Sequence, residues 1–257
     1  MSAVGAAAGA RVRVVALHGF AGHAESWSAV RSALGERPFE AITLFGHEPT
    51  RPPTATIAFE DEVGRVAAVI RSLGAPVRLC GYSMGGRIAL GLLATAPELV
   101  ESAVVIGAHP GLTSDVERLQ RIAGDEVWVR VLEDEGIEAF TAKWQAQPLF
   151  ATQERLAPER LAQQRAVRLR HDAHGLALAM ASLGLGRMPS YWEALDRAEV
   201  PVHLVVGGED VKFAALAARM KERLPAALGT LHVVDGAGHN VLLERPERLA
   251  EVIAGLG

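Results

Sequence analysis

The chain has 257 residues, of which 49% are hydrophobic, so it can bury one large core and need not contain more than one domain. A net charge of −4, with no long block of like charge, argues against a nucleic-acid partner. The opening "MSAVGAAAGARVRVVAL" lacks a basic start followed by a long apolar stretch, so we expect neither a signal peptide nor a membrane span. We therefore predict a cytoplasmic protein whose partner is a small molecule, with no nucleic-acid and no membrane partner.

Cys80 is the only cysteine, which excludes an internal disulfide and any zinc site built from several cysteines. It lies within an apolar run. We expect a buried strand residue there and not a reactive nucleophile.

Short apolar runs rich in β-branched residues predict six buried strands. They occupy residues 11–17, 41–45, 76–82, 102–107, 200–207 and 230–235. Helical periodicity lies between them, most clearly from Phe59 to Leu73, where Gly74 and Pro76 end the pattern. Strands that alternate with helices predict an α/β fold with a mainly parallel sheet covered on both faces.

The alternation stops after the fourth predicted strand. From Thr113 to about Met188 no strand pattern appears, and apolar residues recur at helical spacing. We expect a helical cap over residues 113–188, inserted into a core formed by residues 1–112 and 189–257.

The stretch "GYSMG" at residues 81–85 fits G-x-S-x-G and lies where a predicted strand meets a predicted helix. A tight turn there raises Ser83 to the carboxyl edge of the sheet, and Gly81 and Gly85 leave room for the neighbouring backbone. The alternative is a glycine-rich connector whose serine only caps the helix.

A serine hydroxyl becomes a useful nucleophile or base only when a histidine takes its proton and a carboxylate orients that histidine. His239 follows the sixth predicted strand, and either Asp210 or Glu209 follows the fifth. The backbone N–H groups of Met84 and of Phe20, in "LHGFAG", are candidate donors to an oxyanion. We expect the histidine of that loop, His18, to organise the turn and not to transfer protons.

The order Ser, Asp, His and the G-x-S-x-G motif resemble the α/β-hydrolases over nearly the whole chain. Within them the chain is most similar to the 2-succinyl-6-hydroxy-2,4-cyclohexadiene-1-carboxylate synthases of menaquinone biosynthesis. The segments that carry this likeness are "HGFAGHAESW", "GYSMGGRIAL", "HPGL" at 109, "WQAQPLF" at 144, "SLGLGRMPSYWEAL" at 182 and "GGEDVKF" at 207. The resemblance implies an α/β-hydrolase fold, doubly wound, with a helical cap, and it favours Asp210 over Glu209.

The resemblance also implies a lyase that eliminates pyruvate from an enolpyruvyl cyclohexene, with Ser83, His239 and Asp210 acting together as the base. Phe20 and Met84 would supply the oxyanion hole. No metal and no organic cofactor is implied. The substrate is a polycarboxylate, which guanidinium groups bind well.

The residues implied to bind this substrate are mainly arginines. Arg87 lies one helical turn after Ser83 and on the same face. The likeness implies Arg121 and Arg170 as further carboxylate ligands, with Arg118 as the alternative to Arg121, and Trp144 as a wall of the cavity. Tyr82 and Lys212 are weaker candidates that can equally support the site.

One loop departs from the family pattern. "TLFGHEPTRPP" places Thr43, Phe45 and Glu48 where related proteins more often have an acidic strand residue and P-G-H-G. Two alternatives to the lyase remain at this point: a carboxylesterase of small esters, which shares the serine, histidine and aspartate, and a non-catalytic small-molecule binding protein on the same fold.

Overall fold

The structure is a computed structural model that describes residues 12–256, so most of the opening segment lies outside the described residues. Residues 12–256 form six strands, and every adjacent pair in the sheet is parallel. The strands are β1 (Val14–Leu17), β2 (Phe39–Ile42), β3 (Val77–Tyr82), β4 (Val100–Ile106), β5 (Val202–Gly207) and β6 (Gly229–Val234). Their spatial order is β2-β1-β3-β4-β5-β6. The six strands match the six predicted runs, and the parallel α/β sheet expected from the sequence is confirmed.

The sheet is buried on both faces. In β1, Val14 and Ala16 belong to one hydrophobic cluster and Val15 and Leu17 to the other, although all four are fully buried. Successive side chains of a strand point to opposite faces, so a continuous apolar run is what a doubly covered parallel strand requires.

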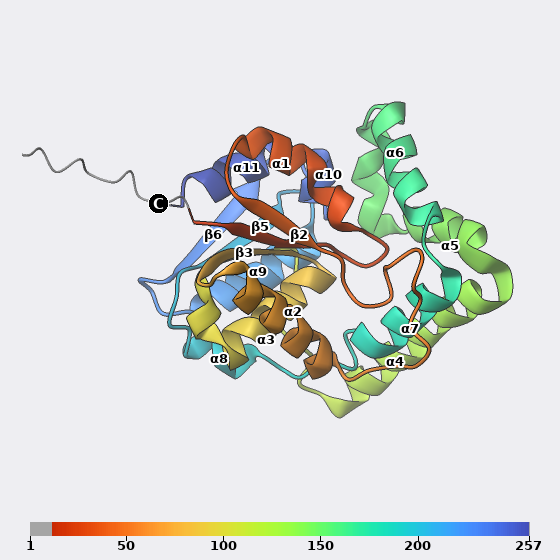
Figure 1. Cartoon of the computed structure of the whole chain (residues 1–257), viewed down its shortest axis with the longest axis horizontal. Coiled ribbons are helices and arrows are strands. Elements are labelled where there is room, and N and C mark those ends of the chain that lie inside the picture. The colour runs from red at the N-terminus through yellow and green to blue at the C-terminus, as the bar shows by residue number, and fades with distance from the viewer. Residues whose placement is uncertain (1–11, 257) are drawn as a thin grey trace, which may run out of the picture.

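Helices cover the two faces (Figure 1). One hydrophobic cluster joins the sheet to α1 (Ser28–Leu34), α10 (Val241–Glu244) and α11 (Pro246–Ala254). The other joins it to α2 (Phe59–Leu73), α3 (Met84–Thr95), α8 (Trp192–Asp196) and α9 (Val211–Arg223). The helix predicted over 59–73 has these same bounds.

Helical segments fill the chain between β4 and α8. They are α4 (Asp115–Arg130), the π-helical η3 (Val131–Glu135), α5 (Gly136–Gln145), the 3-10 segment η4 (Pro148–Arg155), α6 (Pro158–Leu169) and α7 (Ala173–Leu183). They gather beside the sheet, at the right of Figure 1. Residues 113–188 contain no strand. The division of the chain into separate core and cap domains stays a prediction.

Among residues 12–256, no helix combines the length and the apolar character needed to cross a bilayer.

β2 ends earlier than the sequence predicts, at Ile42 and not at Phe45. The Leu44 amide donates to the ring Nε2 of His18 at 3.0 Å, and the Phe45 amide donates to Glu62 Oε1 at 2.9 Å. Side chains therefore satisfy the two amides that would have extended the ladder with β1.

Glu62 holds this loop from α2. Its carboxylate is buried, and it accepts hydrogen bonds from Phe45 and from the Arg65 guanidinium, whose Nε lies 2.7 Å from Oε2. Arg65 also donates from Nη2 to the Thr43 carbonyl at 2.9 Å. The ion pair between Glu62 and Arg65 thus holds residues 43 and 45 of the loop that departs from the family pattern.

We expect Glu62→Ala to lower the free energy of unfolding by about 2–4 kcal/mol, because it leaves a buried amide and a guanidinium without their acceptor. Urea denaturation measures this change as a shift of the midpoint. Glu98→Ala is the matched control, since Glu98 pairs with Arg71 across 3.4 Å at an exposed position, and its loss should cost less than about 1 kcal/mol. Equal shifts for the two variants would contradict the role given to Glu62.

Candidate active site

Ser83 lies at the sharp turn between β3 and α3. Its φ of 51° is in the left-handed region that residues with a side chain rarely adopt. A Cβ on Gly81 would lie 2.4 Å from the Gly85 carbonyl oxygen, and a Cβ on Gly85 would lie 2.4 Å from the Leu17 carbonyl oxygen. Both glycines are required, because any larger residue would force the backbone segments apart.

His239 and Asp210 converge on this serine from two later strands. His239 Nε2 lies 3.4 Å from Ser83 Oγ, and Nδ1 lies 2.7 Å from Asp210 Oδ2. An ionised carboxylate only accepts hydrogen bonds, so Nδ1 carries the proton and Nε2 keeps a lone pair toward the serine. The structure brings together the three residues singled out in the sequence, in the arrangement that activates a hydroxyl.

Asp210, and not Glu209, faces the histidine. The Asp210 side chain is buried and also accepts a hydrogen bond from the Phe213 amide at the start of α9. Glu209 is turned to the surface, where its Oε2 lies 2.7 Å from Nη2 of Arg155. The two neighbouring carboxylates therefore have separate partners.

The sequence analysis missed Glu244, which holds the histidine loop. Its buried carboxylate accepts from the Gly238 amide at 2.7 Å and from the Asn240 amide at 3.2 Å. These amides flank His239 on both sides. A glutamate five residues after the histidine, in "GHNVLLERP", was the available signal.

Two buried histidines join the loop after β1 to the loop after β2. The Ala21 amide donates to Nε2 of His47 at 3.1 Å, while His18 Nε2 accepts from Leu44 in the opposite direction. Burial lowers the pKa of His18 to about 3 and that of His47 well below its usual value. Both rings are therefore neutral acceptors at physiological pH, which agrees with the organising role expected of His18.

The same loop stands against the serine turn. The Gly85 amide donates to the His18 carbonyl oxygen at 3.0 Å, which ties the start of α3 to the end of β1. Phe20 and Met84, whose amides are the candidate oxyanion donors, both line the cavity above Ser83. His171, at the start of the segment that leads into α7, donates from Nδ1 to the His47 carbonyl oxygen at 3.2 Å. His47 thus connects the helical segments to the loop that carries Phe20.

The cavity above Ser83 has a volume of about 520 Å³ and is lined by three cationic side chains, those of Arg87, Arg121 and Lys212. Arg87 donates from Nη1 to the Leu183 carbonyl oxygen at 2.6 Å and has no ion-pair partner within residues 12–256. Burial, together with the nearby Arg121, lowers the pKa of Arg87 to about 9. The cavity therefore favours an anionic ligand.

Arg121 reaches the cavity and Arg118 does not. Arg121 Nε lies 2.8 Å from Asp125 Oδ1, and both residues line the cavity. Arg118 instead donates to the Met188 carbonyl oxygen at 2.7 Å and does not line the cavity. Of the two alternatives that the sequence left open, the structure brings only Arg121 to the site.

Aromatic side chains form one wall. Trp144 lines the cavity and its ring centroid lies 5.2 Å from that of Phe20 and 4.9 Å from that of Trp128. Tyr82 and Lys212 line the cavity as well. His109, to which the sequence analysis gave no catalytic role, is a further lining residue whose pKa burial and nearby Arg87 lower to about 4.

Arg170 is not brought to this cavity. It lies at the surface and pairs with Glu25. Arg168, two residues earlier, is 4% exposed and its Nη1 has no hydrogen-bond partner within residues 12–256. The expectation for Arg170 is corrected here: α6 turns Arg168 inward and leaves Arg170 outside.

Residues 12–256 contain no group of three or more histidine, cysteine, aspartate or glutamate side chains placed to hold a metal ion.

A parallel sheet with a serine at a strand–helix turn, and an aspartate and a histidine after later strands, defines the α/β-hydrolase class of fold. The chain belongs to the alpha/beta hydrolase family, to which residues 14–252 match.

Several relatives are synthases of one kind. A protein of Enterobacter sp. (strain 638), named 2-succinyl-6-hydroxy-2,4-cyclohexadiene-1-carboxylate synthase, is 30% identical over 94% of this chain and 90% of its own length. A Bacillus subtilis (strain 168) protein, provisionally given the same name, is 34% identical over 94% of this chain and 88% of its own. The solved structure of MenH from S. aureus is 27% identical, covers 95% of this chain and 92% of its own, and superposes with a TM-score of 0.90.

Asp210 and Glu209 have different partners, His239 and Arg155, and this difference can be tested without a substrate. Asp210→Asn should slow covalent labelling of Ser83 by a fluorophosphonate by about three to four orders of magnitude, because the histidine loses the acceptor that fixes its tautomer. Mass spectrometry of the labelled serine gives the rate. Glu209→Gln is the matched control and should label at the rate of the unchanged protein; slow labelling of that variant instead would transfer the role to Glu209.

Proposed function

We propose that this chain is a carbon–oxygen lyase that eliminates pyruvate from 2-succinyl-5-enolpyruvyl-6-hydroxy-3-cyclohexene-1-carboxylate, giving 2-succinyl-6-hydroxy-2,4-cyclohexadiene-1-carboxylate. The observation that carries the proposal is the position of Ser83, His239 and Asp210 beneath a cavity whose charged lining is mainly cationic. The names of the relatives agree with it.

The change in double bonds defines the proton that must be removed. The substrate has one ring double bond at C3, and the product has two, at C2 and C4. Loss of the C2 proton lets the C2–H electron pair form C2=C3, the old double bond shift to C4=C5, and the C5–O bond break. Enolpyruvate leaves with that electron pair and becomes pyruvate by taking up one proton.

Ser83 acts as the base in this proposal. Its hydroxyl proton passes to His239 Nε2 while the serine oxygen removes the C2 proton, and Asp210 stabilises the imidazolium that forms. The same imidazolium then holds the proton that the departing enolpyruvate needs. No water enters and no acyl-enzyme forms.

The candidate oxyanion donors stabilise the negative charge that forms when the C2 proton is removed. C2 is adjacent to the succinyl carbonyl, so negative charge moves onto that oxygen as the proton leaves. The Phe20 and Met84 amides are assigned to this oxygen, with the Phe20 loop held by His47 and His18.

Carboxylates of the substrate are assigned to Arg87 and Arg121. Guanidinium binds carboxylate through paired hydrogen bonds, and Arg87 forms no ion pair within residues 12–256. Trp144 closes the apolar side of the cavity, and Tyr82 and Lys212 border the same space. The cytoplasmic location expected from the sequence stays a prediction.

A carboxylesterase is the competing function, because the same serine, histidine and aspartate can open an ester. It gives no reason for two arginines and a lysine in one cavity. A neutral aryl ester would gain nothing from their charge.

The direct test is pyruvate release from the enolpyruvyl substrate. The substrate is made enzymatically in the assay mixture, and lactate dehydrogenase with NADH reports the pyruvate. We expect fast release by the unchanged protein and a loss of at least about 10³-fold in Ser83→Ala. Hydrolysis of a short aryl ester, measured in parallel, should be slow. Fast ester cleavage without pyruvate release would make the protein an esterase.

Removing the ring acceptor of His47 should affect turnover more than binding. In His47→Phe the Ala21 amide loses its partner, so we expect kcat to fall while KM changes little. The fall should not exceed the roughly 10²- to 10³-fold that loss of a whole oxyanion donor costs. His174→Phe, at an exposed position, is the control. An unchanged kcat in His47→Phe would show that Phe20 is held in place without it.

A further inference from the structure

Two histidines face each other across the last two strands of the sheet. His203 is the second residue of β5, and His232 is the fourth residue of β6, which lies at the sheet's edge (Figure 1). In the parallel register His203 lies beside Thr230 and His232 lies beside Val205, so the histidines are diagonal neighbours. Side chains two positions apart along a strand point to the same face. Both imidazole rings therefore lie on one face of the sheet.

That face is the one covered by α1 and α11. Val205 and Val234, each two residues after one of the histidines, belong to the hydrophobic cluster that joins the sheet to these helices. His203 and His232 themselves are only half-buried. The pair therefore lies at the margin of the cluster, where water and small ions reach the rings.

The two rings meet through their nitrogens. His203 Nδ1 lies 3.1 Å from His232 Nε2, with the ring planes inclined by 35°. One of these nitrogens carries the proton and donates it to the lone pair of the other. Within residues 12–256 neither ring makes a second hydrogen bond. No further polar contact therefore fixes the tautomer of either ring.

This nitrogen pair has nearly the spacing of two ligands on one metal ion. Two imidazole nitrogens on a tetrahedral Zn²⁺, each at about 2.1 Å, lie about 3.4 Å apart. A small opening of the pair therefore admits the ion. The proton between the rings moves, through water, to the free nitrogen of the ring that carried it, so both rings stay neutral and each offers a lone pair.

We propose that His203 and His232 bind a divalent transition-metal ion that joins β5 to β6. Imidazole suits Zn²⁺, Ni²⁺ and Cu²⁺, whereas Mg²⁺ prefers oxygen ligands. Water fills the remaining coordination positions, because residues 12–256 bring no third histidine, cysteine or carboxylate to the pair. The ion takes no part in the elimination, so this site is independent of the proposed function.

The site joins the two strands that lead to the catalytic acid and histidine. Asp210 follows His203 by seven residues along the chain, and His239 follows His232 by seven. β6 pairs with β5 alone, since it is the last strand of the sheet. An ion that binds the native pair, and not the unfolded chain, stabilises this pairing as it saturates the site. The expected effect is on stability and not on the reaction.

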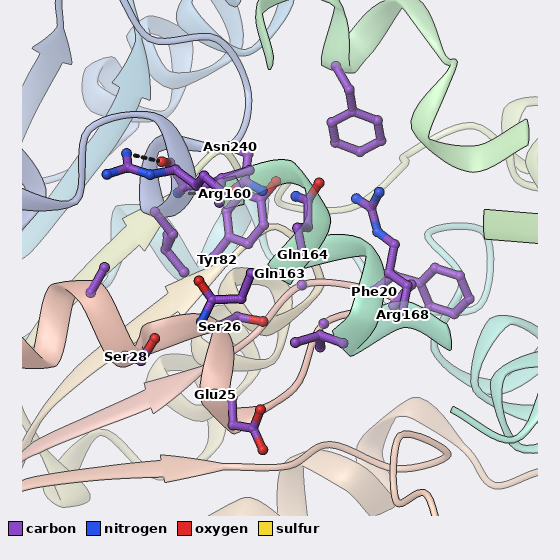
Figure 2. Close-up of a pocket in the computed structure, with 18 residues that line it drawn as sticks. Phe20, Glu25, Ser26, Ser28, Tyr82, Arg160, Gln163, Gln164, Arg168 and Asn240 are labelled. Atoms are coloured by element: carbon purple, nitrogen blue, oxygen red, sulfur yellow. Dashed lines mark hydrogen bonds between the residues drawn. The ribbon is translucent and has the colours of Figure 1, made fainter. Parts of the chain in front are cut away.

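The pair is separate from both cavities of the molecule. The cavity above Ser83 is lined by His109 and His239. A second cavity, of about 230 Å³, lies between α6 and the η1 segment (Ala24–Trp27), and no histidine is among the described residues that line it (Figure 2). His239, with Asp210 beside it, is therefore the competing metal ligand for which an experiment needs a control.

The first experiment is a calorimetric titration of the full chain, without a polyhistidine tag, with ZnCl₂. We expect a single site whose Kd rises by at least about tenfold in His203→Gln and in His232→Gln, because each variant removes one of two ligands. His174→Gln, at an exposed position, is the matched control and should leave the Kd unchanged. His239→Gln should also leave it unchanged.

The number of ligands is measured with Cu²⁺. Electron paramagnetic resonance resolves the coupling of copper to each bound nitrogen, and we expect two nitrogens in the unchanged protein and one in either variant. Zn²⁺ should raise the melting temperature of the unchanged protein and of neither variant, and Mg²⁺ should raise none. Melting temperatures without metal show whether the variants fold, and the copper spectrum of the unchanged protein decides the proposal even where one does not.

Three results would overturn the site. The first is no binding of Zn²⁺, or binding that His203→Gln and His232→Gln leave unchanged. The second is loss of Zn²⁺ binding in His239→Gln, which would place the ion beside Asp210. The third is a single nitrogen on Cu²⁺ in the unchanged protein, because one ring would then bind the ion without its neighbour.

Discussion

The contact on which the site depends is between the backbone at Gly85 and the end of β1. The Gly85 amide reaches the His18 carbonyl oxygen, and no Cβ fits between Gly85 and Leu17. This contact sets the serine turn and the Phe20 loop side by side, so that the Ser83 hydroxyl and the candidate oxyanion donors face one space. Without this contact, the Ser83 hydroxyl would not lie beside His239, Asp210 and the cavity above them.

Charge is distributed unevenly around that space. Acids near Ser83 are already engaged, Asp210 with His239 and Asp125 with Arg121, whereas Arg87 and Arg168 form no ion pair within residues 12–256. Desolvation makes an unpaired buried guanidinium unfavourable, and in the proposed function the carboxylates of the substrate offset this cost. The same burial that costs stability in the free protein would then favour binding of a polyanion.

Much of the fold followed from the sequence because its signals are local. Apolar runs located all six strands, and the helical spacing of apolar residues predicted both ends of α2. The carboxyl ends of parallel strands lie at one edge of a sheet, so the positions of Ser83, Asp210 and His239 after their strands predicted that these residues meet. Arg168 and Arg170 show where this reasoning stops: on a helix, residues two apart point about 200° apart, so one faces inward when the other faces out. Only the packing of α6 decides which. Glu244 was missed although its contacts are local, since the amides that it holds lie four and six residues before it.

His47 gives the helical segments a direct mechanical link to the reaction centre. Its carbonyl is held by His171, and its ring holds the Ala21 amide beside Phe20. A displacement of the segment that leads into α7 therefore changes the geometry of the Phe20 loop, whatever else the helices contact. These helices are not an interchangeable module: grafting the corresponding segment from another member of the family onto this sheet would also require a donor at position 171 that reaches the same carbonyl.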